Sequence, residues 1–318
     1  MCTAIAYSNG GLYFGRTLDY ERSFGEELVF TPRNFPFRFR QVRNLEHHLA
    51  IVGMAHVAQG YPLYYDAMNE KGLCMAGLNF VGFARYCGEA RDKVAPFEFI
   101  PWVLGQCETV ADVRSLLTHT VLTETDFSEH LPAARLHWLI ADAKETITVE
   151  STAEGLCVYD NPVGVLTNNP PFPEQLRHLG SFAHLSPLPQ VNHFPIDLPP
   201  ISRGLGAVGL PGDLSSQSRF VRAAFTRLHS VCPESMALSQ FFHIISTVEQ
   251  TLGCCRLEDG TQEHTIYTSC CDAGHGVYYY TTYGNRRITG IDMNREDPDG
   301  EALCRYPLMT AEDVLLQN

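Results

Sequence analysis

The first nineteen residues constrain this chain more than any other stretch. Two runs rich in β-forming residues, Cys2–Tyr7 and Leu12–Asp19, flank the turn-forming triplet Asn9-Gly10-Gly11. This arrangement is a strong local signal for a β-hairpin. The hairpin would bring Arg16 and Asp19, which lie late in its returning strand, towards the start of the chain.

Cys2 makes this hairpin a candidate for nucleophilic catalysis. Its side chain is small enough for the initiator methionine to be removed, which would leave a thiol and a free α-amine on one residue. An α-amine has an ordinary pKa of about 7.7–8.0, so it accepts a proton near neutral pH without help from histidine. A thiol beside its own base is a complete nucleophilic unit. We expect Arg16 to lower the thiol pKa and Asp19 to hold the ammonium form.

Composition excludes several classes of protein. The 318 residues are 45% hydrophobic and carry a net charge of −13, which argues against a nucleic-acid partner. No apolar run approaches the ~18 residues of a membrane span, and no signal peptide opens the chain, so we expect a cytoplasmic protein. The segment from Arg16 to Arg43 is locally basic. Solvated strand faces explain most of its arginines, although an anionic small substrate would also suit this charge.

Cysteine and histidine spacing gives no sign of a disulfide framework or a metal site. The eleven cysteines include no Cys-x-x-Cys pair, and the thirteen histidines show no zinc-binding pattern, so we expect reduced thiols and no metal. Residues 204–209 match G-x-G-x-x-G, but Pro199-Pro200 precede them and Pro211 follows. A dinucleotide fingerprint must join a strand to a helix, so we expect a loop here and no bound nucleotide.

Hydrophobic patterning predicts a single α+β domain with strands at both ends that pair with each other. Asn79 and Asn168 each stand where a predicted strand becomes a loop. An amide N–H at such a place can stabilise the oxyanion that forms when a thiol attacks an amide. Strands are expected at 27–30, 35–40, 49–55, 62–68, 73–80, 136–140, 146–150, 156–159, 163–167, 265–269, 277–283 and 287–293. Helices are expected at 96–106, 109–117, 218–230, 235–250 and 311–316, and irregular chain at 118–134 and 184–212.

Five segments form an ordered set of motifs along the chain: Cys2-Thr3-Ala4, Phe14–Asp19, Gly77–Phe80, Leu166–Pro170 and Gly209–Arg222. Together they resemble the choloylglycine hydrolase family of N-terminal nucleophile enzymes, which includes bile salt hydrolases and penicillin V acylases. The chain departs from the family pattern after Asn169-Pro170, where 172–179 replaces an aromatic residue, a histidine and Thr-Asn-Leu.

The resemblance implies a four-layer αββα sandwich of the N-terminal nucleophile hydrolase type. The chain would form one catalytic domain, 1–318, with Met1 removed, and would assemble as a homotetramer. The nucleophile would be Cys2, and no cofactor would be needed. The family's other catalytic positions fall on Arg16, Asp19, Asn79, Asn168 and Arg219, with Arg222 supporting a helix instead.

The implied activity is hydrolysis of glycine- or taurine-conjugated bile salts through a Cys2 acyl-thioester. Relatives that act on bile salts resemble this chain in carrying asparagine at position 79, where penicillin-preferring relatives tend to carry tyrosine. Penicillin V hydrolysis, acyl transfer to amines and an inactive binding protein of the same fold remain alternatives. The apolar walls of the substrate pocket are expected from Tyr20, Phe24, Tyr61, Tyr64, Phe127 and Leu131.

Overall fold

The computed structural model describes residues 1–86 and 88–318, and its centre is the predicted hairpin. Strands β1 (Cys2–Ser8) and β2 (Leu12–Tyr20) pair antiparallel, with Cys2 opposite Leu18. The turn needs glycine because Gly10 has φ of +69°, a left-handed conformation that other residues rarely adopt. The hairpin prediction is confirmed.

This hairpin lies inside the first of two large antiparallel sheets. The seven-stranded sheet has the order β12-β1-β2-β14-β15-β16, with β13 paired to β14. Since β14 comes from the end of the chain, the predicted pairing of terminal strands is confirmed. Close approach of β14 depends on Gly15, where an added Cβ would lie 1.9 Å from the Ser269 carbonyl oxygen. The remaining strands are β12 (Val165–Leu166), β13 (Cys255–Arg256), β14 (Gln262–Asp272), β15 (Val277–Thr282) and β16 (Thr289–Asp292).

The second sheet has eight strands in the order β11-β10-β9-β6-β5-β4-β3-β17, and β7 and β8 form a separate parallel pair. Its central strands are almost wholly apolar, as expected of strands buried on both faces. The bounds are β3 (Glu27–Thr31), β4 (Ile51–Ala58), β5 (Tyr61–Asn69), β6 (Cys74–Asn79), β7 (Asp92–Val94), β8 (Thr120–Leu122), β9 (Leu136–Ala141), β10 (Thr146–Thr152), β11 (Gly155–Asp160) and β17 (Cys304–Pro307).

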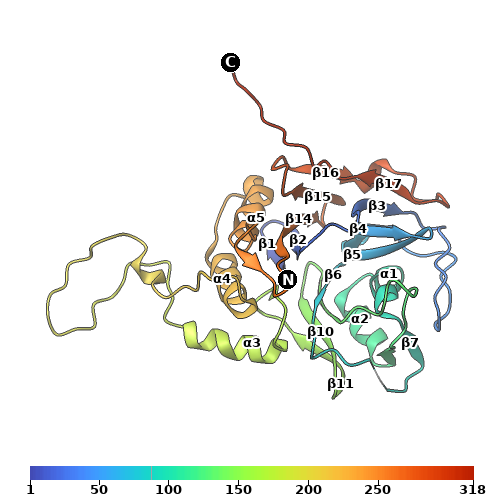
Figure 1. Cartoon of the computed structure of the whole chain (residues 1–318), viewed down its shortest axis with the longest axis horizontal. Coiled ribbons are helices and arrows are strands. Elements are labelled where there is room, and N and C mark those ends of the chain that lie inside the picture. Colours follow the sequence, from blue (N-terminus) through green and yellow to red (C-terminus); the bar gives the residue numbers. More distant parts are fainter. Residues whose placement is uncertain (87) are drawn as a thin grey trace.

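Helices cover the outer faces of both sheets, which gives the four-layer αββα sandwich that the sequence predicted (Figure 1). One buried cluster joins α4 and α5 to the first sheet and fills the space between the sheets, and a second lies between the other sheet and α1 and α2. Thr109 caps α2 with Asp112 in the predicted capping box. The helices are α1 (Phe99–Leu104), α2 (Val110–Leu117), α3 (Phe172–Leu179), α4 (Ser216–His229) and α5 (Ala237–Ser246).

Three local predictions were wrong. Residues 35–40 form no strand, because side chains of Asn44 and Glu98 bind the backbone N–H groups of Phe39 and Arg40 in place of a neighbouring strand. Residues 311–316 are exposed and non-helical, since nothing covers their apolar side chains. The irregular stretch 118–134 contains β8, and α3 was not predicted at all.

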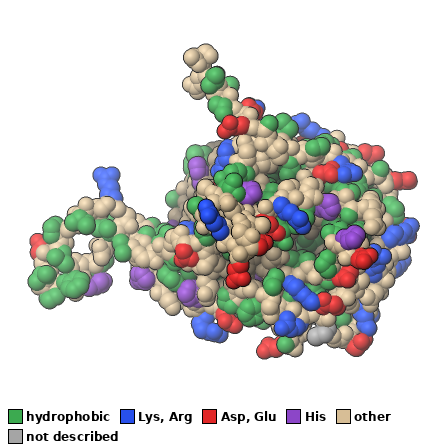
Figure 2. All heavy atoms as spheres, viewed as in Figure 1, with side chains coloured by type: hydrophobic (Ala, Val, Ile, Leu, Met, Phe, Trp, Pro, Cys, Tyr) green, Lys and Arg blue, Asp and Glu red, His purple; other side chains and the backbone are tan. Residues whose placement is uncertain are grey.

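The segment 184–212 is irregular, as predicted, except for a short 3-10 turn at Leu205–Ala207. It extends from the body as a long arm (Figure 1). Hydrophobic side chains are visible on its surface (Figure 2). Exposed arm residues include Leu188, Val191, Phe194, Ile196, Leu198 and Ile201.

Candidate active site

The Cys2 thiol lies at the start of β1, on the wall of a cavity. The residue is only 2% exposed and lines this cavity together with its hairpin partner Leu18. Because β1 is hydrogen-bonded to β12 on one side and β2 on the other, the backbone that carries the thiol is fixed from both sides. The position therefore suits a nucleophile that must meet a substrate in one orientation.

Arg16 places a buried positive charge at the same wall. Its guanidinium donates hydrogen bonds to the carbonyl oxygens of Thr17 (3.2 Å), Tyr65 (3.3 Å) and Gly77. Burial opposes this charge, but neighbouring acidic groups, Cys2 first among them, outweigh it and raise the pKa of Arg16 above its ordinary value. A permanent cation beside the thiol favours the thiolate.

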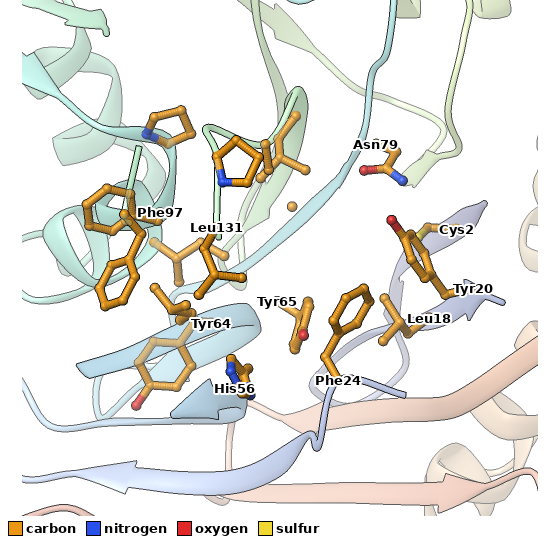
Figure 3. A pocket seen from close by; sticks show the side chains of 18 of the residues that line it. Cys2, Leu18, Tyr20, Phe24, His56, Tyr64, Tyr65, Asn79, Phe97 and Leu131 are labelled. Atoms are coloured by element: carbon orange, nitrogen blue, oxygen red, sulfur yellow. The ribbon is translucent and has the colours of Figure 1, made fainter. Parts of the chain in front are cut away.

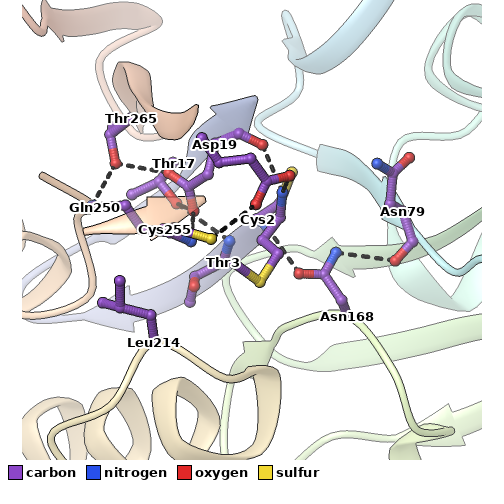
Figure 4. A network of polar contacts seen from close by, with 12 residues as sticks. Cys2, Thr3, Thr17, Asp19, Asn79, Asn168, Leu214, Gln250, Cys255 and Thr265 are labelled. Atoms are coloured by element: carbon purple, nitrogen blue, oxygen red, sulfur yellow. Dashed lines mark hydrogen bonds and ion pairs between the residues drawn. The ribbon is translucent and has the colours of Figure 1, made fainter. Parts of the chain in front are cut away.

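Asp19 lies behind the cavity and is surrounded by neutral hydrogen-bond donors. Its carboxylate accepts hydrogen bonds from the Thr265 hydroxyl (2.6 Å), the Thr17 hydroxyl (3.0 Å) and the Gln250 amide (3.3 Å). Burial raises the pKa of Asp19, and the Arg219 charge and the α-ammonium at the chain start oppose that rise. The carboxylate is thus held in one orientation beside the Cys2 backbone (Figure 4).

The Asn168 side chain links Cys2 to Arg219 and to the backbone of Asn79. Its Oδ1 accepts hydrogen bonds from the Cys2 nitrogen and from Arg219, each 2.8 Å long, and its Nδ2 donates to the Asn79 carbonyl oxygen at 2.9 Å (Figure 4). The Asn79 side chain itself points into the cavity wall near Cys2 (Figure 3). The two asparagines predicted from strand ends are therefore adjacent in space.

Arg219 is fully buried and clamps the backbone around Cys2. It donates to the Cys2 carbonyl oxygen (2.5 Å), the Thr3 hydroxyl (2.6 Å) and Asn168 Oδ1. Burial lowers the pKa of Arg219, and the acidic groups of Asp19 and Cys2 oppose this. Arg222, by contrast, donates to carbonyl oxygens at Thr247, Pro211 and Asp213 beside α4.

Met1 is present in this structure, so the Cys2 nitrogen is a peptide nitrogen. The Met1 α-ammonium donates to the Asp19 carbonyl oxygen (2.6 Å) and forms an ion pair with Glu263 (2.9 Å). All six candidate catalytic residues thus lie in one cluster: Cys2, Arg16 and Asn79 line the cavity, while Asp19, Asn168 and Arg219 lie behind it.

The cavity has room for about 240 Å³ of water-sized molecules, and its walls are largely apolar (Figure 3). The expected wall residue Tyr61 does not line it, because its ring packs behind Phe127 with centroids 6.0 Å apart. Sequence reasoning missed several wall residues, among them His56, Tyr65, Phe97 and Ile100. The other five expected wall residues, Tyr20, Phe24, Tyr64, Phe127 and Leu131, all line the cavity.

Sequence reasoning also missed a buried set that holds the backbone at Asn168. Gln175 donates to the Asn168 carbonyl oxygen (2.5 Å) and accepts from the Thr167 hydroxyl (2.8 Å). His137 donates from Nε2 to the Thr167 carbonyl oxygen (2.8 Å) and contacts Glu150 through Nδ1 (3.0 Å). A polar residue at an inward position of an apolar strand was the available signal for His137 and Glu150.

The part of the chain that the structure describes offers no cluster of three or more His, Cys, Asp or Glu side chains that could hold a metal. Nor does it contain a helix long and apolar enough to cross a membrane. The ten described cysteines form no disulfide. Residues 204–209 contain the 3-10 turn of the arm, Leu205–Ala207, and they neither follow a strand nor open an α-helix.

Comparisons with known proteins agree with this architecture. A bile salt hydrolase/transferase of Lactiplantibacillus plantarum is 54% identical over 314 residues, which cover 97% of each chain. A solved conjugated bile acid hydrolase of Clostridium perfringens superposes with a TM-score of 0.91 at 35% identity, with both chains fully covered. A penicillin V acylase of Agrobacterium tumefaciens shares the fold, with a TM-score of 0.76 at 22% identity over 97% of this chain and 92% of that one.

The family described as linear amide C–N hydrolases, choloylglycine hydrolase family, matches residues 2–306. This match covers both sheets and every candidate catalytic residue. The sequence resemblance is therefore confirmed, and the chain belongs to the choloylglycine hydrolase family of N-terminal nucleophile enzymes that hydrolyse linear amides.

Proposed function

We propose that this enzyme hydrolyses the amide bond of glycine- or taurine-conjugated bile salts. The observation that carries the proposal is the Cys2 thiol at the wall of a large cavity with largely apolar walls. A bile salt combines an apolar steroid with an anionic tail joined through an amide, so its pocket needs apolar walls and a few polar groups near the thiol. The 54% identical relative named bile salt hydrolase/transferase supports the same substrate class.

Removal of Met1 is the first requirement of the mechanism. It frees the Cys2 α-amine, which then accepts the thiol proton as the sulfur attacks the amide carbonyl carbon. The Cys2 nitrogen already donates a hydrogen bond to Asn168 Oδ1, so this fixed acceptor would orient the amine and direct its lone pair once Met1 is removed. Asp19 stabilises the ammonium form of the amine, and Arg16 stabilises the thiolate.

The attack forms a tetrahedral intermediate with a negatively charged oxygen. The Asn79 side chain makes no hydrogen bond to any described residue, so its amide N–H groups are available to this oxyanion. Asn168 Nδ2 carries two hydrogens and donates one to the Asn79 carbonyl oxygen, which leaves the other for the same task. Arg219 donates hydrogen bonds to Asn168 and to the Cys2 carbonyl oxygen, and so fixes their positions relative to each other.

Collapse of this intermediate gives a thioester, and hydrolysis of the thioester completes the reaction. The C–N bond breaks as the α-ammonium protonates the departing glycine or taurine nitrogen, and the acyl group stays on sulfur as a thioester. The α-amine then takes a proton from water as the water attacks the thioester. The C–S bond of the second intermediate breaks, the α-ammonium returns the proton to sulfur, and the free bile acid is released.

Acyl transfer to an amine is a second candidate activity, because an amine that enters the cavity in place of water would intercept the same thioester. The relatives named hydrolase/transferase favour it. Penicillin V hydrolysis would use the same machinery. Glycine and taurine release from conjugated bile salts, phenoxyacetate release from penicillin V and formation of new amides in the presence of added amines distinguish the three activities in one purified preparation.

We further propose that the chain is one catalytic domain that works in the cytoplasm as a homotetramer. The arm at 184–212 supports the assembly, because its exposed apolar side chains, Ile201 at 93% exposure among them, would be covered by another subunit. Sedimentation equilibrium measures the assembled mass. A monomer at micromolar concentration would contradict this part of the proposal.

A further inference from the structure

His56 is a polar side chain in an otherwise largely apolar part of the cavity. It lies on β4, and the alternation of that strand gives it the same face as Val52 and Met54, which pack in the core between the sheets. At His56 this face reaches the cavity, where the ring lies between Phe24 and Tyr64 and away from Cys2 and Asn79 (Figure 3).

The His56 ring has no hydrogen-bond partner among the residues that the structure describes. Its Nδ1 is buried and makes no hydrogen bond, and no hydrogen bond among the described residues uses either ring nitrogen. A buried polar atom without a partner destabilises the fold, so such a residue is rarely kept without a compensating contact. Because Nδ1 is closed off, Nε2 is the nitrogen that a molecule in the cavity can reach.

We propose that His56 Nε2 binds one of the steroid hydroxyl groups that differ between bile salts, which makes it a residue that determines specificity among them. This inference rests on the proposed function and adds a preference within it. A neutral imidazole nitrogen either donates or accepts, depending on its tautomer, and no protein partner fixes that tautomer here. A hydroxyl group has the same versatility, so the two match in either direction.

The anionic tail is a poorer match for this position. The tail carboxylate or sulfonate is separated from the scissile amide by only one or two carbon atoms, so it must stay near Cys2 when the thiol attacks. His56 lies among aromatic and aliphatic walls, where an unpaired anion would be costly. The steroid reaches farther from the amide, and its hydroxyl groups are the polar atoms that it carries into the cavity.

The test compares glycocholate, glycodeoxycholate and glycochenodeoxycholate, which share a tail and a ring skeleton and differ in ring hydroxyl groups. Taurocholate is included because it differs from glycocholate in the tail alone. We expect the native enzyme to favour glycocholate over at least one conjugate that lacks a hydroxyl. His56→Leu should reduce that kcat/KM ratio by about fivefold to tenfold, the effect of one neutral hydrogen bond. His56→Gln, which keeps a donor and an acceptor, should retain most of the ratio and guards against a folding failure of the first variant.

Val57→Ala is the matched control, because Val57 lies on the opposite face of β4 and packs towards the helix-covered core. Its kcat/KM ratios should equal those of the native enzyme. Unchanged hydroxyl ratios in His56→Leu would overturn the inference, and so would a change confined to the glycine-to-taurine ratio, which would assign the tail to His56. A native enzyme that cleaves none of the conjugates would instead overturn the proposed function.

Discussion

The side-chain amide of Asn168 contacts both the Cys2 nitrogen and the backbone of Asn79. Its oxygen binds the Cys2 nitrogen and Arg219, while its nitrogen binds the Asn79 backbone. One residue thus orients the proposed base and helps to build the proposed oxyanion site. Both tasks act on the transition state more than on substrate binding.

We therefore expect Asn168→Ala to lower kcat about 10²–10³-fold, the usual effect of removing one oxyanion donor, with little change in KM. Steady-state kinetics with glycocholate measures both constants. Asn169→Ala is the control, because that side chain donates to the Val81 carbonyl oxygen at the surface. A raised KM with an unchanged kcat would assign Asn168 to ground-state binding instead.

The second prediction at this scale is that the active enzyme begins at Cys2. An amide nitrogen has no basicity, so the Met1–Cys2 peptide bond present in this structure would block the proposed base. Intact-mass measurement should show the loss of one methionine in every active preparation. Full activity in protein that quantitatively retains Met1 would exclude the self-base mechanism.

Among the elements, β2 and β14 show how a backbone contact positions the site. Gly15 allows β14 to lie against the hairpin, and β14 supplies Thr265 to the Asp19 carboxylate. A methyl group at position 15 would meet the Ser269 carbonyl oxygen at 1.9 Å, so the two strands would have to separate.

We expect Gly15→Ala to lower the free energy of unfolding by about 1–3 kcal/mol, the usual range for overpacking. Gly11→Ala is the matched control, because a Cβ at that position meets nothing within 4 Å. Urea denaturation of the two variants gives the comparison. Equal stability of both variants would show that β2 and β14 separate at little cost.

The start of α4 carries a pH-dependent contact. Hydrogen bonds from Ser215 and Ser218 lower the pKa of Asp213 to about 2. The unfolded-state pKa of aspartate is about 3.9, so the folded state binds fewer protons and gains stability from this contact above that pH. The contribution is lost as the pH falls towards 2.

Asp213→Ala should therefore lower the melting temperature at pH 7, and the difference from the native enzyme should shrink as the pH falls from 4 towards 2. Asp197→Ala, at an exposed position of the arm, is the control. Thermal unfolding followed by circular dichroism across this range gives the result. A difference that stays constant down to pH 2 would rule out the carboxylate as its source.

The sequence predicted well those elements that are determined by their own residues. The hairpin has a glycine turn, and α2 has its capping box, so local signals were sufficient. Residues 35–40 alternate like a strand, but only Phe37 pairs with another backbone segment, in an isolated bridge to Leu45. Side chains of Asn44 and Glu98 bind the N–H groups of Phe39 and Arg40, which no local pattern reveals. The strand predicted at 163–167 is present but is only two residues long, because only Val165 and Leu166 pair with β1.

At the scale of the whole molecule, the catalytic cluster was more predictable than the cavity. The six candidate catalytic residues stood in motifs at fixed places in the chain, and family resemblance assigned them together. The walls come from β2, β4, β5, the segment before α1 and the loop 127–134. Which aromatic residues face inward depends on packing between these distant segments, which is why Tyr61 was wrongly included and His56 missed.

The last prediction concerns the substrate that this cavity selects. Its walls are broad and largely apolar, and Asn79 leaves more room beside the thiol than a tyrosine ring would. A rigid steroid buries more apolar surface against such walls than a phenoxymethyl group does, and apolar burial is worth about 25 cal/mol per Å². We therefore expect kcat/KM for glycocholate or taurocholate to exceed that for penicillin V, measured under one set of conditions. Penicillin V ahead by tenfold or more would reverse the substrate assignment and leave the thioester mechanism intact.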